Sequence, residues 1–419
     1  MHLVKTLSAL AIVGGFLPTA QALSIKDDVI SLGVGVRLQT RLQINDGTDR
    51  VGDDYRIQSG TRNAANDDLD FSIHRARLYL NGKYGANWKF QLAFASDGID
   101  AGTQVGATNG NNNRLAQVRY AWIERQFKIN DDFSHAIHAG LDKPYQNPSD
   151  AAMSSSRDLF PNRNRAATFL APRGVGIGYR LTAPIASLAL DLQNNTSATK
   201  DVDNDAGSNN NEEGEGFYYG ARVEFSILKD WFTTKRAESY AGKEGTALVI
   251  GASYGVNDGA LVDATAAVVG PPVVAATVDR TVDTTAYGVD LLFHYHMITA
   301  YAEYRMMNVD TDNITGADTD IDSDVILAQL GYAFPLANDT VIEPCVRYQI
   351  IDLNTDNDDE LAEFGANAES GTSGDQIDLG INYYLDGHSN KLQLAYSMWS
   401  AEEGDAEANI IRLQHQINF

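Results

Sequence analysis

The chain has 419 residues, a formal net charge of −24 at pH 7 and a mean hydropathy of −0.27. This acidic balance argues against nucleic acid as a partner, because phosphates and carboxylates repel each other. The single cysteine, Cys345, excludes an internal disulfide, and no linker or break in composition divides the chain into several domains.

The first 22 residues have the features of a secretory signal peptide. Lys5 precedes an apolar run over 7–17, and Ala20-Gln21-Ala22 fits the small-residue cleavage motif. We therefore expect a signal peptide over 1–22 and a single mature domain over 23–419. The apolar run is too short to span a bilayer as a helix, and no other run of about 18 apolar residues occurs. Export without a helical span indicates a secreted, periplasmic or outer-membrane protein.

Segments with a two-residue period recur along the rest of the chain. Apolar side chains alternate with polar ones over 30–44, 88–97, 219–227, 377–385 and 411–419. This period is expected when one face of a strand meets lipid and the other meets water. Short turns at 85–87, 129–132, 183–184, 295–296, 336–339 and 386–390 alternate with long polar stretches. The pattern predicts an all-β, transmembrane antiparallel barrel of about sixteen strands; about eighteen is the alternative, because 260–269 is a candidate extra strand.

Two stretches in the N-terminal half carry a family resemblance. The first contains Arg75-Ala76-Arg77-Leu78, Gly82-Lys83 and Trp88, and the second contains Gly140, Lys143-Pro144, Ser155-Ser156-Arg157 and the run 171–178. Together they resemble the R-x-R-L…G-K…W strand pair and the G-x-x-K-x-P-F, S-S-R and P-x-R-x-G-V-G segments of the phosphate-selective porin O/P family. The resemblance implies a homotrimer of water-filled outer-membrane barrels, in which a long loop, here about 143–172, folds inward as a constriction.

This long loop and the polar strand faces are rich in arginine. The stretch 143–172 is longer than a simple hairpin connection and is typical of a functional loop. Planar guanidinium groups match the oxygens of phosphate and carboxylate, so they suit the passage of oxyanions. The candidate pore-lining and constriction residues are Arg37, Arg41, Arg75, Arg77, Arg119, Arg125, Arg222, Lys143, Arg157, Arg163, Arg165 and Arg173. The alternative is that these arginines form salt bridges with Glu224, Glu303, Glu343 and Asp378 and only keep the lumen polar.

These features predict passive diffusion of small hydrophilic solutes and ions across the outer membrane, with anions such as phosphate as candidates. The long connections are acidic, however, notably over 201–213, 310–324 and 352–360. Such stretches should repel anions over about a Debye length, roughly 8 Å at physiological salt. A general or cation-preferring pore therefore stays open as the alternative.

Two further motifs point to other chemistry. Asp201, Asp203, Asp205 and Glu212 match part of the spacing of a calcium-binding loop, but Gly207 stands one position too late. Solvated acidic surface is the alternative, and we expect no cofactor beyond this candidate Ca²⁺. The run 251–255 matches the G-x-S-x-G nucleophile elbow, yet no amphipathic helix follows it. We therefore expect no enzyme, and an outer-membrane hydrolase remains only as an alternative from another class.

The last nine residues alternate and finish on an aromatic side chain. Arg412, Gln414 and Gln416 should face water, while Ile411, Leu413, Ile417 and Phe419 should face lipid. The segment resembles the closing strand of an outer-membrane barrel, whose terminal Phe is part of the signal read by the barrel assembly machinery. The expected partners are this machinery, outer-membrane lipid and lipopolysaccharide.

Overall fold

The computed structural model describes residues 23–26, 29–47, 68–99, 117–130, 132–144, 154–164, 173–194, 217–228, 237–266, 276–313, 319–352, 373–402 and 407–419. Candidate residue Arg165, the candidate calcium residues Asp201, Asp203, Asp205 and Glu212, and the expected signal peptide lie outside these ranges. Within the described ranges, no helix is long and apolar enough to cross a membrane.

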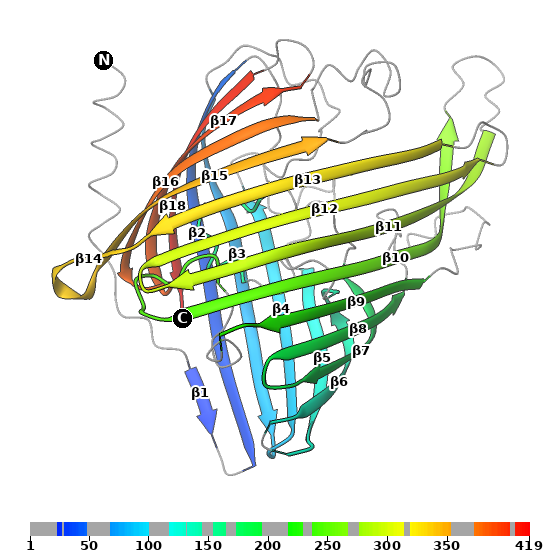
Figure 1. Ribbon diagram of the computed structural model, residues 1–419, viewed down its shortest axis with the longest axis horizontal. Coiled ribbons are helices and arrows are strands. Elements are labelled where there is room, and N and C mark those ends of the chain that lie inside the picture. Colours follow the sequence, from blue (N-terminus) through cyan, green and yellow to red (C-terminus); the bar gives the residue numbers. More distant parts are fainter. Residues whose placement is uncertain are drawn as a thin grey trace.

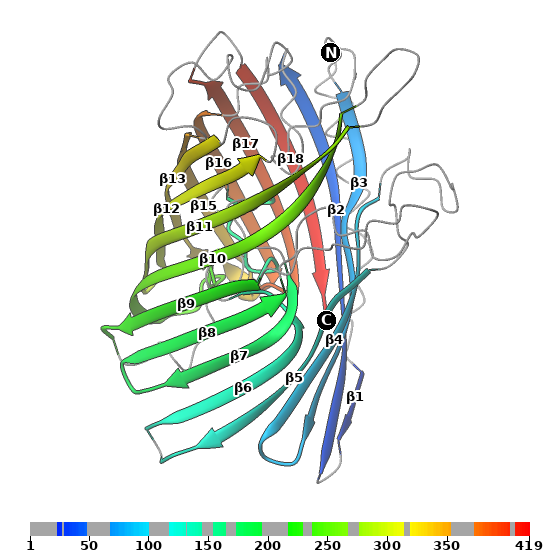
Figure 2. The same ribbon diagram turned by 90° about the vertical axis from the view of Figure 1, so that its right-hand side faces the viewer.

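The described strands form one antiparallel sheet that closes on itself (Figures 1 and 2). Sixteen of them make the barrel wall, which confirms the predicted fold and strand number. The first eight are β2 (Ile30–Gly47), β3 (Asp68–Tyr84), β4 (Trp88–Ile99), β5 (Gln117–Lys128), β6 (Ser134–Asp142), β7 (Gly174–Thr182), β8 (Ala186–Asn194) and β9 (Phe217–Ser226). The others are β10 (Thr246–Ala266), β11 (Ala276–Tyr295), β12 (Ile298–Asn313), β13 (Thr319–Tyr332), β15 (Val341–Asp352), β16 (Gly374–Asp386), β17 (Asn390–Ala401) and β18 (Glu407–Asn418).

Closure of the barrel joins the last strand to the first. β18 pairs antiparallel with β2 from Ala408↔Gly47 to Asn418↔Arg37, and the two strands lie side by side in Figure 2. Beyond the end of β18, the short strand β1 (Leu23–Lys26) pairs with residues 31–34 of β2. A second short strand, β14 (Phe334–Pro335), pairs with the beginning of β15. The candidate extra strand at 260–269 is wrong, because β10 continues through 260–266 and pairs there with β11.

Alternation along the strands separates an apolar outer face from a polar interior. In β15, for example, Pro344, Val346 and Tyr348 are exposed on the outside, while Glu343 and Arg347 are buried inside. The two-residue period produces this separation because successive side chains of a strand point to opposite faces. Most buried side chains of the barrel are therefore polar, and the buried apolar residues form only small clusters.

The connections at one end of the barrel are short, and all of them but one are brief turns. These turns are at 85–87, 129–133, 183–185, 296–297 and 387–389, with a short 3₁₀ element at Ala337–Asp339. Outer-membrane barrels carry such turns on the periplasmic side. The exception joins β9 to β10. Its described residues are 227–228 and 237–245, and the second stretch includes five consecutive buried residues, 237–241.

Candidate functional site

Part of the long connection between β6 and β7 lies inside the barrel. Its middle described stretch, Ser154 to Asn164, is buried or half-buried throughout, and Leu159 and Phe160 are each only 1% exposed. We call this segment the constriction loop. It crosses the interior beside the inner faces of β2 and of β15–β18, as its hydrogen bonds to these strands show.

Polar side chains of the barrel wall hold the backbone carbonyls of the constriction loop. A loop inside a barrel has no strand neighbour, and buried carbonyls left without donors are costly. The wall supplies these donors: Arg41 to Pro161 O (3.0 Å), Arg347 to Asn162 O (3.2 Å), Asn382 to Leu159 O (2.9 Å), Lys391 to Asp158 O (3.0 Å) and Gln416 to Ser156 O (3.0 Å). Arg41 therefore anchors the loop through a backbone carbonyl, a contact that the predictions from the sequence did not include.

Two apolar side chains fix the middle of the loop. Leu159 and Phe160 form a buried cluster with Cys345 and Ala395 of the wall. Phe160 lies over Gly380, where a Cβ atom would come within 2.8 Å of the ring. The Arg347 guanidinium lies 4.5 Å from the centre of the same ring, a cation–π distance. Side-chain packing therefore holds the loop in place in addition to the hydrogen bonds.

Polar residues of the last strand belong to the same inner hydrogen-bond network, and Gln416 is the one of them that donates to a loop carbonyl. Arg412, Gln414 and Gln416 point inward, as the sequence predicts, and Ile411 and Phe419 are exposed on the outer face. The three inward residues are nevertheless buried instead of lining open water, because the constriction loop and neighbouring polar side chains cover them.

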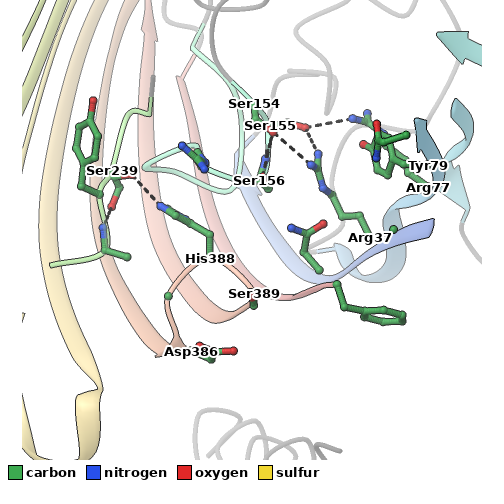
Figure 3. Close-up of a pocket in the computed structure, with 18 of the residues that line it drawn as sticks. Arg37, Arg77, Tyr79, Ser154, Ser155, Ser156, Ser239, Asp386, His388 and Ser389 are labelled. Atoms are coloured by element: carbon green, nitrogen blue, oxygen red, sulfur yellow. Dashed lines mark hydrogen bonds between the residues drawn. The ribbon is translucent and has the colours of Figure 1, made fainter. Parts of the chain in front are cut away.

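Arg37 and Arg77 converge on the serine turn of the loop from β2 and β3. Their guanidinium groups donate to Ser155 Oγ at 2.7 and 3.1 Å, and Arg37 also reaches Ser154 Oγ at 3.3 Å (Figure 3). Arg37 lies 5.4 Å from the ring centre of Tyr79. Arg75 donates to the side chain of Gln39 in the same wall. The R-x-R motif thus contributes directly to the seat of the loop.

A cavity of about 1440 Å³ opens between the constriction loop and the turns at the periplasmic end. Its lining includes the basic residues Arg37, Arg77, Arg119, Lys143, Arg157, Arg163 and Lys243 and the acidic residues Asp142, Asp339 and Asp386. The structure therefore brings together six of the predicted candidates at one cavity, and positive charge predominates there. Whether they act on passing ions stays a prediction.

The other candidates lie in different surroundings. Arg222 forms ion pairs with Glu224 (2.6 Å) and Asp290 (2.7 Å) on the buried inner wall, so its charge is locally balanced. Arg173 lies just before β7 and donates to Tyr120 Oη at 3.4 Å. The prediction for Arg125 is wrong: a bulge after Ala93 shifts the register of β5, and the exposed Arg125 packs near Trp88 and Phe127, 5.2 and 4.7 Å from their ring centres.

The serine of the esterase-like motif lies within a strand. Ser253 is buried on the inner face of β10, and Gly251 lies against Arg222 and Asp290. No strand-to-helix turn follows, which the nucleophile elbow requires. Among the residues that the structure describes, no group of three His, Cys, Asp or Glu side chains could hold a metal ion.

Sequence reasoning missed a second inward segment. Ala237, Glu238, Ser239, Tyr240 and Ala241 are buried inside the barrel, and Glu238 and Ser239 form hydrogen bonds with the constriction loop. The one available signal was length, because the connection after β9 is longer than the other periplasmic turns. Nothing in its residues indicates by itself that it folds inward.

A closed sixteen-stranded barrel with an apolar outer face, a polar interior and an inward loop defines the class: an outer-membrane porin. The family model for phosphate-selective porins O and P matches residues 48–419. The chain therefore belongs to the phosphate-selective porin O and P family and to the bacterial outer membrane. The curated protein sequences contain no match to the chain.

Solved structures show the same fold at low identity. OmpF of Salmonella typhi, in complex with daunomycin, is 12% identical with a TM-score of 0.55, covering 94% of this chain and 100% of that one. The loop L8 deletion mutant of OmpT of Vibrio cholerae is 13% identical (TM-score 0.53; 93% and 99% covered). OprB of Pseudomonas putida is 11% identical (TM-score 0.53; 93% and 94% covered). At these identities the comparisons support the barrel fold alone.

Proposed function

We propose that this diffusion channel favours small anions and that the basic cavity beneath the constriction loop gives this preference. The single observation that carries the proposal is the excess of basic over acidic side chains in the lining of that cavity. Charges near a narrow, partly desolvated passage act on ions more strongly than charges in open solvent. The name of the family and its candidate substrate, phosphate, point in the same direction.

General or cation-preferring diffusion is the second candidate. The observation that favours it is the acidity of the connecting stretches, such as 201–213 and 352–360, in a chain of net charge −24. Exposed carboxylates are screened within roughly 8 Å at physiological salt, so they act on ions less than charges beside the passage. We therefore rank the anion-preferring pore first.

A homotrimer is the assembly that we propose. The resemblance of the chain to the phosphate-selective porin O and P family implies a trimer. One solved barrel of the same fold, OmpT of Vibrio cholerae, is described in a trimer form (TM-score 0.51, 12% identity). Outer-membrane lipid, lipopolysaccharide and the barrel assembly machinery are proposed partners. Size-exclusion chromatography with light scattering in detergent would test the trimer.

The reversal potential in planar bilayers under a KCl gradient tests the ion preference. We expect the wild type to favour chloride and the double variant Arg37→Gln/Arg77→Gln to lose much of this preference. A charge about 10 Å from an ion contributes on the order of 1 kcal/mol, so the permeability ratio should fall roughly fivefold or more. Arg125→Gln is the control for the effect of one of these charges, because it removes a single positive charge from the outer face. A cation-selective wild type would contradict the proposal.

A further inference from the structure

The segment 237–245 enters the barrel from the periplasmic end and packs against its inner wall. Ala237 and Tyr240 form an apolar cluster with residues of β10–β13, including Val249 and Leu292. The ring of His294 stacks on Tyr240 with 4.1 Å between ring centres. We call this segment the periplasmic strut. Its apolar contacts hold it against the inner wall of β10–β13.

Hydrogen bonds tie the strut to β15, β16 and the turn that follows β16. Ser239 Oγ donates to Glu343 Oε2 at 2.7 Å and lies 2.7 Å from Tyr384 Oη. His388 Nε2 donates to Ser239 O at 2.8 Å (Figure 3). Ser239 is fully buried, so these contacts fix the position of the neighbouring Glu238.

The strut also contacts the constriction loop directly. Leu159 N donates to Glu238 Oε2 at 2.9 Å, and Asn164 Nδ2 donates to Glu238 Oε1 at 3.5 Å. Ser239 N donates to Arg157 O at 3.2 Å. Glu238 thus bridges two points of the loop with one carboxylate that is itself only 2% exposed.

This bridge complements what the barrel wall supplies. The wall side chains that reach the loop backbone, such as Arg41, Lys391 and Asn382, are donors and bind carbonyls. Glu238 is an acceptor and binds a loop N–H instead, and a charged acceptor makes a stronger bond than a neutral one. A buried N–H without an acceptor is costly, so removal of the carboxylate should weaken the seat of the loop.

We propose that Glu238 is a positioning residue for the pore: the periplasmic strut clamps the constriction loop from below and sets the width of the passage. The passage is therefore bounded by two segments that approach from opposite ends of the barrel. The inference rests on the channel function and does not depend on which ion the channel favours.

Single-channel recording of three variants in planar bilayers tests this proposal. Glu238→Ala removes the acceptor and the charge, while Glu238→Gln removes the charge and keeps an oxygen for Leu159 N–H. Glu244→Ala is the matched control, because it removes the same charge from an exposed position of the strut. Heat-modifiable migration in SDS gels verifies for each variant that the barrel is folded.

We expect Glu238→Ala to raise the open-channel conductance and to increase the time spent in fluctuating sublevels roughly tenfold, a change equivalent to about 1.4 kcal/mol in loop seating. Glu238→Gln, which keeps a weaker neutral acceptor, should lie between the wild type and Glu238→Ala, and Glu244→Ala should match the wild type. Wild-type conductance and noise in Glu238→Ala would overturn the proposal. So would a Glu238→Gln variant as noisy as Glu238→Ala, because the charge and not the bridge would then be the cause. The reversal potential of the wild type, measured separately, decides the anion preference.

Discussion

At the scale of single residues, the structure gives physical reasons for the family motifs. Gly140 has a φ of 126°, and a Cβ atom there would lie 2.2 Å from Ala121 O. Only glycine tolerates this backbone conformation and this close approach of a neighbouring strand. The motif that begins at Gly140 therefore marks the point where β6 ends and the chain turns toward the constriction loop.

Asp158 is the residue of the loop whose charge depends on pH in the neutral range. It is buried, and its ion-pair partner is Arg163, with Nε and Oδ2 3.6 Å apart. Burial, followed by the nearby Glu238, raises the pKa of Asp158 to about 7, against the opposing effect of cationic neighbours. The charged groups that face it are Glu238, Arg163, Arg75, Lys391 and Arg37.

The seat of the loop should therefore weaken as the pH rises. Because the pKa of Asp158 is higher in the seated loop than in a released loop, protonation of Asp158 stabilises the seated loop. This stabilisation is complete below about pH 4 and is lost as the pH rises through about 7. We expect more time in sublevels at pH 8 than at pH 5, up to roughly a hundredfold, since each of the two pH units between 5 and the pKa of about 7 contributes a factor of about ten. Single-channel recording at both pH values measures this. Asp158→Asn should remove the dependence, and an equal dependence in that variant would refute the assignment.

At the scale of elements, the strands could be predicted and the two inward segments could be predicted only in part. A strand with lipid on one face and polar groups on the other needs alternating apolar and polar residues. This alternation is visible in the sequence over 30–44 and 411–419. The constriction loop was expected from its length and from a resemblance. The strut was not, because its burial depends on partners such as Glu343 and Tyr384, which are distant in sequence.

The site residues, too, could be predicted only in part from the sequence. Alternation places Arg37, Arg41 and Arg77 on the inner face correctly, but it does not reveal that they hold loop atoms. Arg125 was misplaced because one bulge inverts the inward and outward faces of the strand beyond it. Cys345, on the inner face of β15, packs against Leu159 and Phe160 of the loop. Side-chain direction is thus predictable only where the register is uninterrupted.

The fit between loop and wall can be tested at Gly380. A Cβ atom at this position would lie 2.7 Å from Cys345 Sγ and 2.8 Å from a Phe160 ring carbon. Gly380→Ala should therefore displace Phe160 and cost about 1–3 kcal/mol of loop seating, as overpacked sites do. We expect higher conductance and faster proteolysis within the loop, while the barrel still migrates as a folded species in gels. Unchanged conductance and proteolysis would show that Phe160 does not seat the loop.

At the scale of the whole molecule, two sets of charges should have opposite effects on the ion preference of the channel. The chain carries 56 acidic and 32 basic residues, yet basic side chains predominate around the cavity beneath the loop. The acidic connecting stretches should act on ions through solvent, and the cavity acts at short range. Added salt weakens the first influence much more than the second, because the Debye length falls from about 30 Å at 0.01 M to about 3 Å at 1 M.

The ion preference should therefore depend on salt in a specific direction. The most direct measurement is the reversal potential of the purified wild-type protein in planar bilayers under a fixed KCl ratio, at low and at high mean concentration. The cavity-based account predicts that chloride is favoured in both and that this preference increases from low to high salt. Cation selectivity that persists at high salt would contradict the account. The acidic connecting stretches are screened at high salt, so they could not cause such selectivity.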